Sequence, residues 1–393
     1  MTLIRPLNVF LVAGEESGDR LGGALMRALT AHTQGKVQYQ GVGGDAMARA
    51  GLNSLFSLAE TAIVGFATIP RQLPAIMRRI RDTAAAAIAA KPDVLVIIDS
   101  PEFTHRVAQR VRRHAAEIPI VDYVSPSVWA WRSGRAAAMR RYIDHVLALL
   151  PFEPAVYARL GGPPCTYVGH PLSERVDVLR PNADEQRRRD AAPPILLVMP
   201  GSRRNEIRHM LDVFARTVEL VADRAGPLEI VMPTVPAVAP MLTEAMQSRR
   251  FPARVIVESA EKDAAFRSAR AALVKSGTGT LELALAGVPM VASYRLRALE
   301  AFVFTHFVNT PSVVLTNLVL EEYVVPELLQ KDATPERLAK ALVPLIGDTP
   351  QREAQLKAFG RLDDILEIGD NVPSERAAKI VLDTAATGRK LPS

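Results

Sequence analysis

Two glycine- and hydroxyl-rich loops stand out because each follows an apolar run and precedes a helical pattern. Glycine lets a backbone approach a ligand closely, and free amides at the start of a helix attract an anion. Arg203 adds a forked cation, and Glu282, in the first turn of the second helix, could accept hydrogen bonds from ribose hydroxyls. Either loop alone could simply cap its helix, whereas two such loops in one domain favour a nucleotide diphosphate. The loop residues are Gly201, Ser202 and Arg203, followed by Ser276, Gly277, Thr278, Gly279 and Thr280.

Two common nucleotide motifs fit the sequence poorly. Lys275 precedes the glycines of its loop, so the lysine-bearing phosphate loop of ATP hydrolases is absent. Gly41, Gly43 and Ala46 match a dinucleotide fingerprint, but no acidic residue ends a strand about 20 positions later, as ribose binding in that motif requires. The sequence therefore disfavours ATP hydrolysis and nicotinamide chemistry.

The first half of the chain places carboxylates after its apolar runs. Glu15, Glu16, Ser17 and Asp19 follow the first run, and such groups suit a neutral, hydroxyl-rich ligand better than a bare phosphate. Asp99 directly follows five apolar residues, at the end of a strand expected to be central. A carboxylate there could take a proton from an alcohol, or could cap the next helix.

Aromatic residues and a histidine accompany these carboxylates. Trp129 and Trp131, the two tryptophans of the chain, lie beside Ser125, Ser127 and Arg132. Their rings could pack on a sugar or belong to the core. His170 could likewise face a ligand or be buried and hydrogen-bonded.

The loops that carry these residues lie between strands and helices that alternate along the chain. Short apolar runs predict buried parallel strands, and helix-length amphipathic stretches separate them. The pattern predicts an α/β protein with parallel sheets covered on both faces. The Pro-rich, charged segment 179–194 has no apolar period and is expected to connect two α/β halves, and the chain is expected to be helical after about residue 334. The predicted strands begin at residues 7, 37, 93, 119, 145, 194, 228, 254, 271 and 288.

Composition and charge narrow the class of protein. The 393 residues are 48% hydrophobic and 23% charged, and Cys165 is the one cysteine, so no internal disulfide forms. The first apolar run is too short for a signal peptide, and we expect no segment to span a membrane, which takes about 20 apolar residues. Residues 1–180 hold 21 Lys and Arg against 15 Asp and Glu, so the entire net charge of +6 lies there. This surface could meet an anionic lipid or a phosphorylated substrate, but no nucleic-acid-binding motif is present.

The motifs together resemble those of the lipid-A-disaccharide synthases. This resemblance implies the GT-B fold, which has two Rossmann-like, doubly wound parallel-sheet domains facing a central cleft. It implies an acceptor- and membrane-facing domain at 1–178 and a UDP-sugar-binding domain at 179–365. A helical segment at 366–393 could return to the first domain or reach a neighbouring subunit. The matching motifs, in order from residue 14 to 330, are GEESGD, GVGGDAM, IDSPEF, VSPSVWAWR, PFE, VGHPL, PGSRRNEI, SGTGTLE and TNLVLEEYVVPELLQ.

The resemblance also implies a reaction. An inverting glycosyltransferase of this family moves 2,3-diacylglucosamine from UDP-2,3-diacylglucosamine to 2,3-diacylglucosamine 1-phosphate, giving lipid A disaccharide 1-phosphate and UDP, with no metal and no cofactor. Asp99 would be the base, with Glu15 and Ser17 also catalytic. Both glycine loops and Glu282 would bind the nucleotide. Asn317 and Gln330 would contact substrate in other ways. Thr104 stands where the family usually has Asn.

Acylated substrates imply a membrane surface. Residues 62–80 combine apolar side chains with arginines, which could enter the interface and meet anionic headgroups on the cytoplasmic face of the inner membrane. An ordinary helix packed on its sheet is the alternative. The residues expected to contact the membrane are Ile63, Val64, Phe66, Ile69, Arg71, Arg78 and Arg79.

Two other functions share some of these features. Another GT-B enzyme that uses a UDP-sugar, such as a peptidoglycan N-acetylglucosaminyl transferase or an epimerase, would have similar nucleotide loops. A catalytically silent, lipid-binding relative is the alternative that is not an enzyme, and the presence of Asp99, Arg203 and Glu282 together argues against it. A homodimer is compatible with the sequence.

Overall fold

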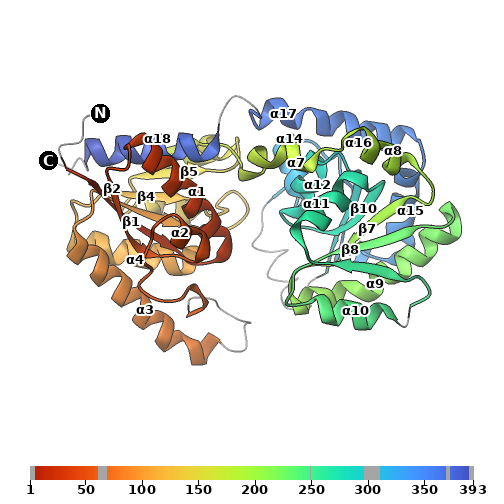
Figure 1. Cartoon of the computed structure of the whole chain (residues 1–393), viewed down its shortest axis with the longest axis horizontal. Helices are drawn as coiled ribbons and strands as arrows, with labels where there is room; N and C mark the ends of the chain where they lie inside the picture. The colour runs from red at the N-terminus through yellow and green to blue at the C-terminus, as the bar shows by residue number, and fades with distance from the viewer. Residues whose placement is uncertain (1–4, 61–68, 248, 296–309, 369–371, 389–393) are drawn as a thin grey trace. The chain divides into compact units, whose positions relative to one another are not determined.

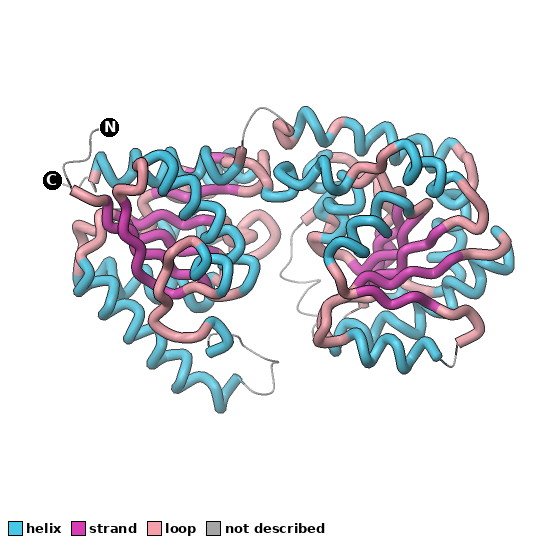
Figure 2. The backbone as a smooth tube through the Cα atoms, viewed as in Figure 1, coloured by secondary structure: helices cyan, strands magenta, loops and turns pink. Residues whose placement is uncertain are grey.

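The computed structural model describes residues 5–60, 69–247, 249–295, 310–368 and 372–388. The chain divides into two compact units. Unit 1 comprises the described parts of 1–173 and 369–393, and unit 2 comprises those of 174–368. Each unit contains a six-stranded parallel sheet with helices on both faces (Figure 2).

The sheet of unit 1 has the strand order β2-β1-β3-β4-β5-β6. Its central strands are continuous apolar runs, because both faces of a parallel sheet are buried. Along β1, Val9 and Leu11 face one core cluster, while Phe10 and Val12 face the other. The strands are β1 (Leu7–Ala13), β2 (Val37–Val42), β3 (Val94–Ile98), β4 (Ile120–Tyr123), β5 (His145–Ala148) and β6 (Cys165–Tyr167).

Helices cover both faces of this sheet. The last helix of the chain, α18 (Pro373–Thr387), packs against α1 and carries Ala377, Ala378 and Val381 into the core of unit 1 (Figure 1). The other helices of unit 1 are α1 (Glu16–His32), α2 (Asp45–Arg49), α3 (Ile69–Ala90), α4 (Pro101–His114), α5 (Gly134–Met139) and α6 (Glu153–Arg159), with a 3-10 turn at Leu58–Glu60.

The sheet of unit 2 has the order β12-β11-β10-β7-β8-β9. One face packs on the helices α9 (Arg204–Ala225) and α15, whose apolar stripes share a core cluster with Leu196 and Val198 of β7. The strands are β7 (Ile195–Met199), β8 (Glu229–Pro233), β9 (Ala253–Ile256), β10 (Ala271–Lys275), β11 (Met290–Tyr294) and β12 (Glu327–Leu329).

Besides α9, the described part of unit 2 contains nine helices and one 3-10 turn, and a second 3-10 turn lies at its start. They are α7 (Val176–Leu179), α8 (Ala183–Asp190), α10 (Ala239–Gln247), α11 (Ser259–Ser268), α12 (Gly279–Leu285), α14 (Leu315–Leu320), α15 (Pro335–Ile346), α16 (Pro350–Gly360), α17 (Leu362–Ile365) and the turn Gln330–Asp332, and another 3-10 turn, Pro171–Arg175, leads into the unit. The helical carboxyl-terminal region was predicted correctly.

The segment 179–194, expected to connect the two halves, contains a helix of its own. It contains helix α8, which begins with a capping box between Asn182 and Glu185 and packs against α11. Arg189 of α8 is buried and donates to the carbonyls of Phe266, Ala286 and Gly287. The segment is therefore part of unit 2.

Each sheet reverses its strand order once. In unit 1 the chain places β2 on one side of β1 and β3 on the other, so the switch lies between β1 and β3. In unit 2 the corresponding switch lies between β7 and β10. Ligands of open α/β sheets bind beyond the carboxyl ends of the strands at such a switch. These two places are where the candidate functional loops are found.

Among the described residues, no helix combines the length and the apolar character that crossing a bilayer requires.

Candidate active site

Asp99 and Ser17 meet at the switch point of unit 1. Ser17 lies in the first turn of helix α1, the helix that follows β1, and Asp99 directly follows β3. The Ser17 hydroxyl donates to Oδ2 of Asp99 at 2.6 Å, and the Ser100 amide donates to Oδ1 at 2.7 Å. Each carboxylate oxygen thus accepts one hydrogen bond and keeps a further lone pair, and the residue is half-buried.

The backbone around Asp99 is held in an unusual conformation. Asp99 and Ser100 both have positive φ angles, 55° and 46°. A Cβ on Gly14 would lie 2.4 Å from the Ser100 Cβ, so only glycine fits opposite this turn. Such strained, well-supported turns concentrate at functional sites.

Thr104 supports the same turn. Its side chain is fully buried, and its hydroxyl donates to the carbonyl of Asp99 at 2.7 Å and to that of Ser100 at 3.1 Å. Thr104 therefore holds the backbone of Asp99 in place.

The other acids of the first motif have different positions. Glu15 and Glu16 are exposed at the start of α1. Asp19 is 3% exposed and accepts hydrogen bonds from the amides of Gly44, Ala46 and Met47. Asp19 therefore caps helix α2, and its oxygens are occupied within unit 1.

The two tryptophans have different environments. Trp129 packs edge-to-face on Phe152, with ring centroids 5.5 Å apart, at the border of the core. Trp131 is 42% exposed, and the guanidinium of Arg132 lies 4.3 Å from its ring centroid. Only Trp131 offers a face to a ligand.

Glu153, which follows the tryptophan segment in the sequence, has a buried carboxyl group. Glu153, at the start of α6, accepts from the Leu150 amide at 3.0 Å. Burial raises the pKa of the Glu153 carboxyl to about 7, and the hydrogen bond from the Leu150 amide opposes part of that shift. Ser125 also donates to the Tyr157 hydroxyl at 3.1 Å.

His170 is a neutral, internally bonded histidine. It is buried, and its Nδ1 accepts from the Leu172 amide at 3.2 Å, which leaves the proton on Nε2. Burial lowers the pKa of His170 to about 4, because the imidazolium form loses hydration.

In unit 2, the loop after β7 leads directly into helix α9. Gly201 has a φ of 129°, and a Cβ there would lie 2.6 Å from the Glu206 carboxylate. That carboxylate accepts from the Ser202 amide at 3.2 Å and lies 3.6 Å from the Arg203 guanidinium. In this structure, therefore, an internal anion lies at the amino terminus of α9. Arg203 itself is largely exposed.

Lys275 connects the two glycine loops. It ends β10, and its Nζ donates to Oε1 of Glu206 at 3.2 Å while lying 4.6 Å from the Tyr294 ring centroid. Because β10 pairs with β7, both loops leave the same edge of the sheet side by side. Lys275 is a cation of this site that the sequence motifs did not identify.

The hydroxyls of the second loop mostly face the protein. Ser276 donates to the carbonyl of Val313, and Thr280 is fully buried and donates to the carbonyl of Gly277. Among the described residues, no acceptor is bonded to the amides of 277–279. Backbone amides, rather than side-chain hydroxyls, are thus the groups available to an anion.

Glu282 is paired with an arginine that sequence analysis missed. Arg175 donates to Oε1 of Glu282 at 3.1 Å and to Oδ1 of Asp263 at 2.8 Å. The Glu282 side chain is one-quarter exposed. Its second oxygen remains able to accept a hydroxyl.

Asn317 and Gln330 lie in the carboxyl-terminal part of unit 2. Asn317 is 3% exposed, and its side-chain amide bonds to the backbone of Val324 and Val325 and to Glu327. Those bonds hold the loop that leads to β12. Gln330 is partly buried and has a φ of 50°.

The structure describes only part of the expected membrane-contacting set. Ile63, Val64 and Phe66 lie outside the described residues, as do the side chains of Ile69 and Arg71. Arg78 is exposed. Arg79 pairs with Glu60 and lies 4.7 Å from the Phe56 ring centroid, so its charge is partly balanced within unit 1.

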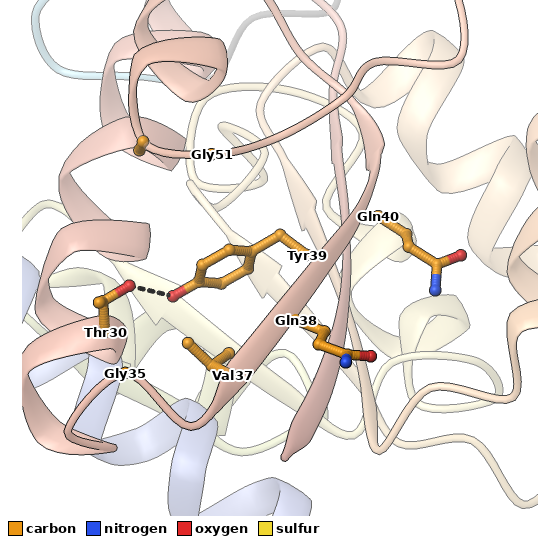
Figure 3. A pocket seen from close by; sticks show the side chains of 8 residues that line it. Thr30, Gly35, Val37, Gln38, Tyr39, Gln40 and Gly51 are labelled. Carbon is orange, nitrogen blue, oxygen red and sulfur yellow. Dashed lines mark hydrogen bonds between the residues drawn. The ribbon is translucent and has the colours of Figure 1, made fainter.

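A separate pocket lies beside strand β2, but it offers few groups for catalysis. The Tyr39 hydroxyl contacts Thr30 at 2.9 Å (Figure 3) and donates to the Met26 carbonyl at 2.7 Å. Burial raises the pKa of Tyr39 to about 12. No acid, cation or histidine lines this pocket. The described residues also contain no group of three or more His, Cys, Asp or Glu side chains arranged to hold a metal ion.

The fold places the chain among GT-B proteins. Solved structures with the same fold include the S. aureus MnaA–UDP co-structure, with a TM-score of 0.66 and 13% identity over 98% of this chain and 99% of that one. Acinetobacter baumannii MurG aligns with a TM-score of 0.58 and 14% identity over 96% and 100% of the two chains.

Sequence comparison defines the family. The profile described as Lipid-A-disaccharide synthetase matches residues 9–381. The lipid-A-disaccharide synthase of Nitrobacter hamburgensis is 58% identical over 381 residues, which cover 97% of this chain and 96% of the relative. That of Bradyrhizobium diazoefficiens is 54% identical, with 97% of each chain covered. The chain belongs to the lipid-A-disaccharide synthase family, and it is a glycosyltransferase of the GT-B fold.

Proposed function

We propose that this enzyme transfers 2,3-diacylglucosamine from UDP-2,3-diacylglucosamine to the 6-hydroxyl of 2,3-diacylglucosamine 1-phosphate. The products are lipid A disaccharide 1-phosphate and UDP. The observation that best supports the proposal, in a chain of this family, is the Asp99 carboxylate at the switch point of unit 1, held by Ser17 and the Ser100 amide.

Asp99 acts as the general base in this proposal. The acceptor oxygen attacks the anomeric carbon as its proton passes to a free lone pair of the Asp99 carboxylate. The new bond joins that oxygen to the anomeric carbon, and the bond to the diphosphate oxygen breaks, with its electron pair leaving on UDP. A single displacement of this kind inverts the anomeric centre.

Unit 2 holds the leaving group. Negative charge grows on the diphosphate as the bond breaks, and preorganised amides and cations lower the energy of that state. The amides of 277–279 and the exposed Arg203 guanidinium are suited to this task. Glu282 would bind the ribose through the oxygen that Arg175 does not occupy.

The remaining assignments are secondary parts of the same proposal. Glu15 is exposed two residues from Ser17 and would orient the acceptor. Asn317 would act through the loop that it holds, and Gln330 would contact the donor. The enzyme would meet its acylated substrates on the cytoplasmic face of the inner membrane through residues 62–80. The two arginines with described side chains there are Arg78 and Arg79.

The direct test is incubation of the purified full chain with both acylated substrates while UDP release and disaccharide formation are followed. We expect stoichiometric UDP and disaccharide from the wild type. No disaccharide from the wild type would refute the proposal. Consumption of UDP-N-acetylglucosamine without any lipid acceptor would instead identify an epimerase-like enzyme.

A further inference from the structure

Three arginines surround one carboxylate close to Asp99. Glu102, in the first turn of α4, lies 3.6 Å from Arg106, 3.7 Å from Arg135 and 3.8 Å from Arg132, measured between charged atoms. One negative charge is therefore shared among three guanidinium groups. The cluster has an excess of two positive charges and can accept a further anion.

The members of the cluster are fixed to different degrees. Arg135 is the most buried of the three, with 21% of its side chain exposed, and it also donates to the Pro101 carbonyl at 3.5 Å. Arg132 is 61% exposed and lies over the Trp131 ring. A guanidinium stacked on an aromatic face keeps its plane oriented and its N–H groups available.

The cluster adjoins the candidate base in the sequence and in the fold. Helix α4 begins two residues after Asp99, so Glu102 is three residues away, and the chain between them spans at most about 10 Å. This upper limit is comparable with the span of a sugar phosphate, so one acceptor molecule can reach both Asp99 and the cluster. The positive end of the 14-residue helix α4 faces the same region and adds to the attraction for an anion.

We propose that Arg132, Arg135 and Arg106 bind a phosphate monoester, namely the 1-phosphate of the acceptor whose hydroxyl Asp99 deprotonates. This inference rests on the proposed function, which assigns a phosphorylated acceptor to unit 1. A phosphate monoester carries nearly two negative charges and three acceptor oxygens, and guanidinium forks match that geometry. Before the acceptor binds, the Glu102 carboxylate balances part of the charge of the arginines. The phosphate dianion then competes with this single negative charge for the guanidinium groups.

The charge and position of the cluster favour a monoester over a membrane headgroup. Two net positive charges match one dianion, whereas most anionic headgroups carry a single charge on a phosphodiester. The partly buried Arg135, fixed on the Pro101 carbonyl beside Asp99, suits a defined ligand better than a fluid surface. The acceptor and the membrane headgroups both present phosphate oxygens, so the experiment must distinguish between these two ligands.

The test compares binding of 2,3-diacylglucosamine 1-phosphate with binding of the same lipid lacking the phosphate, measured on the full chain without donor. Replacing both arginines in the variant R132M/R135M should weaken binding of the phosphorylated lipid roughly tenfold to a hundredfold. Binding of the unphosphorylated lipid should not change. The matched control Arg113→Met removes an exposed arginine near the other end of α4 and should change neither. Glu102→Gln should tighten binding of the phosphorylated lipid, because it removes the competing charge.

Two results would overturn the proposal. One is an equal loss of both lipids in R132M/R135M, which would indicate a general effect on folding or acyl binding. The single variant Arg132→Met, which changes an exposed side chain, is the control for misfolding. If its thermal unfolding matches that of the wild type, its loss of lipid binding is not caused by misfolding. The other is a double variant R132M/R135M that still distinguishes the phosphorylated from the unphosphorylated lipid as the wild type does, but floats less with vesicles containing anionic phospholipid. That result would assign the cluster to the membrane surface.

Binding and turnover separate this inference from the proposed function. If the wild type selects the phosphorylated lipid through the arginines but forms no disaccharide, the subsite stands and the reaction is refuted. If disaccharide forms and R132M/R135M leaves the acceptor KM unchanged, the reaction stands and the subsite is refuted.

Discussion

The two units have the same sheet architecture but present opposite chemistry at corresponding places. At the β1/β3 switch of unit 1 lies a carboxylate, Asp99, held by a hydroxyl and an amide. At the β7/β10 switch of unit 2 lie the amides of 277–279, which no described acceptor binds, and the cations Arg203 and Lys275. The shared topology therefore determines where a ligand binds, and the loop residues determine which group of the ligand is bound.

The units also differ in how they satisfy their sites without ligand. In unit 1 the Asp99 oxygens are each engaged once, so little has to move before a proton can be accepted. In unit 2 the Glu206 carboxylate lies at the start of α9, bonded to the Ser202 amide and Lys275. An incoming diphosphate must compete with that carboxylate. The nucleotide site should therefore select ligands that carry more negative charge than a single carboxylate.

Replacing the base should have the largest effect. We expect Asp99→Asn to lower kcat by about 10²- to 10⁴-fold, because the amide has nearly the same shape but cannot accept the proton. Steady-state assays of UDP release will measure the loss. The nearby buried acid provides a contrast: Asp19→Asn should reduce stability by about 1–3 kcal/mol, through lost hydrogen bonds to α2, and leave kcat much less affected. A wild-type kcat in Asp99→Asn would contradict the assignment.

The buried charges of the units predict different responses to pH. The pKa of Glu153 in unit 1 is about 7 in the folded state, against 4.5 in its reference state. Between these values the folded chain holds a proton that the unfolded chain has lost, so the free energy of unfolding decreases as pH rises from about 4.5 to 7. The loss is about 3 kcal/mol for this group.

Denaturation of the wild type and of Glu153→Gln across this pH range will isolate that contribution. The difference between the two proteins should change by about 3 kcal/mol from pH 4.5 to pH 8, with the wild type relatively weaker at high pH. Unit 2 buries Arg189 and Arg352 instead, and burial lowers their pKa values only to about 10, so both stay charged throughout the range. A constant difference across the range would show that Glu153 does not titrate as described.

Removing the exposed cation of unit 2 should affect the donor alone. Arg203→Met should raise the donor KM about tenfold to a hundredfold, because a charge-assisted contact to phosphate is lost. The acceptor KM should be unchanged. The exposed Arg216, farther along α9, offers the matched control Arg216→Met, which should leave both constants unaltered. An effect on the acceptor KM of similar size would remove the distinction between the units.

The smallest expected effect concerns the arginine behind the ribose site. Arg175→Met should raise the donor KM about threefold to tenfold with little change in kcat, because Glu282 loses the group that orients it. Arg175 is then a positioning residue. In a Glu282→Gln background the same substitution should have almost no further effect on the donor KM. Additive effects in this double-mutant cycle would indicate that Arg175 acts independently.

The regular elements could be predicted wherever the sequence pattern was continuous. The run at 7–13 predicted β1 with its observed ends, because a buried parallel strand is apolar on both faces. The edge strands β6 and β12 were missed, since three residues carry no usable period. Helix α8 was missed because it is charged throughout. Arg189 and the capping box hold it in place, and the carbonyls that Arg189 binds lie about 80 to 100 residues away.

The candidate site was predictable as a set of loops, but less so as a set of contacts. Ser17 and Asp99 belong to motifs 82 residues apart, and the β1/β3 switch brings them together. No local pattern indicated that Arg175 would reach Glu282, 107 residues later. Nor can a sequence show which way a hydroxyl points, and Ser276 and Thr280 bond to backbone carbonyls where a ligand contact was expected.

The division of labour between the units is the central claim, and titration of UDP onto three full-length proteins by calorimetry tests it most directly. We predict that Asp99→Asn binds UDP with the wild-type dissociation constant, whereas Arg203→Met binds it roughly tenfold to a hundredfold more weakly. If Asp99→Asn weakened UDP binding as much as Arg203→Met, nucleotide binding would not be confined to unit 2, and the account would be contradicted.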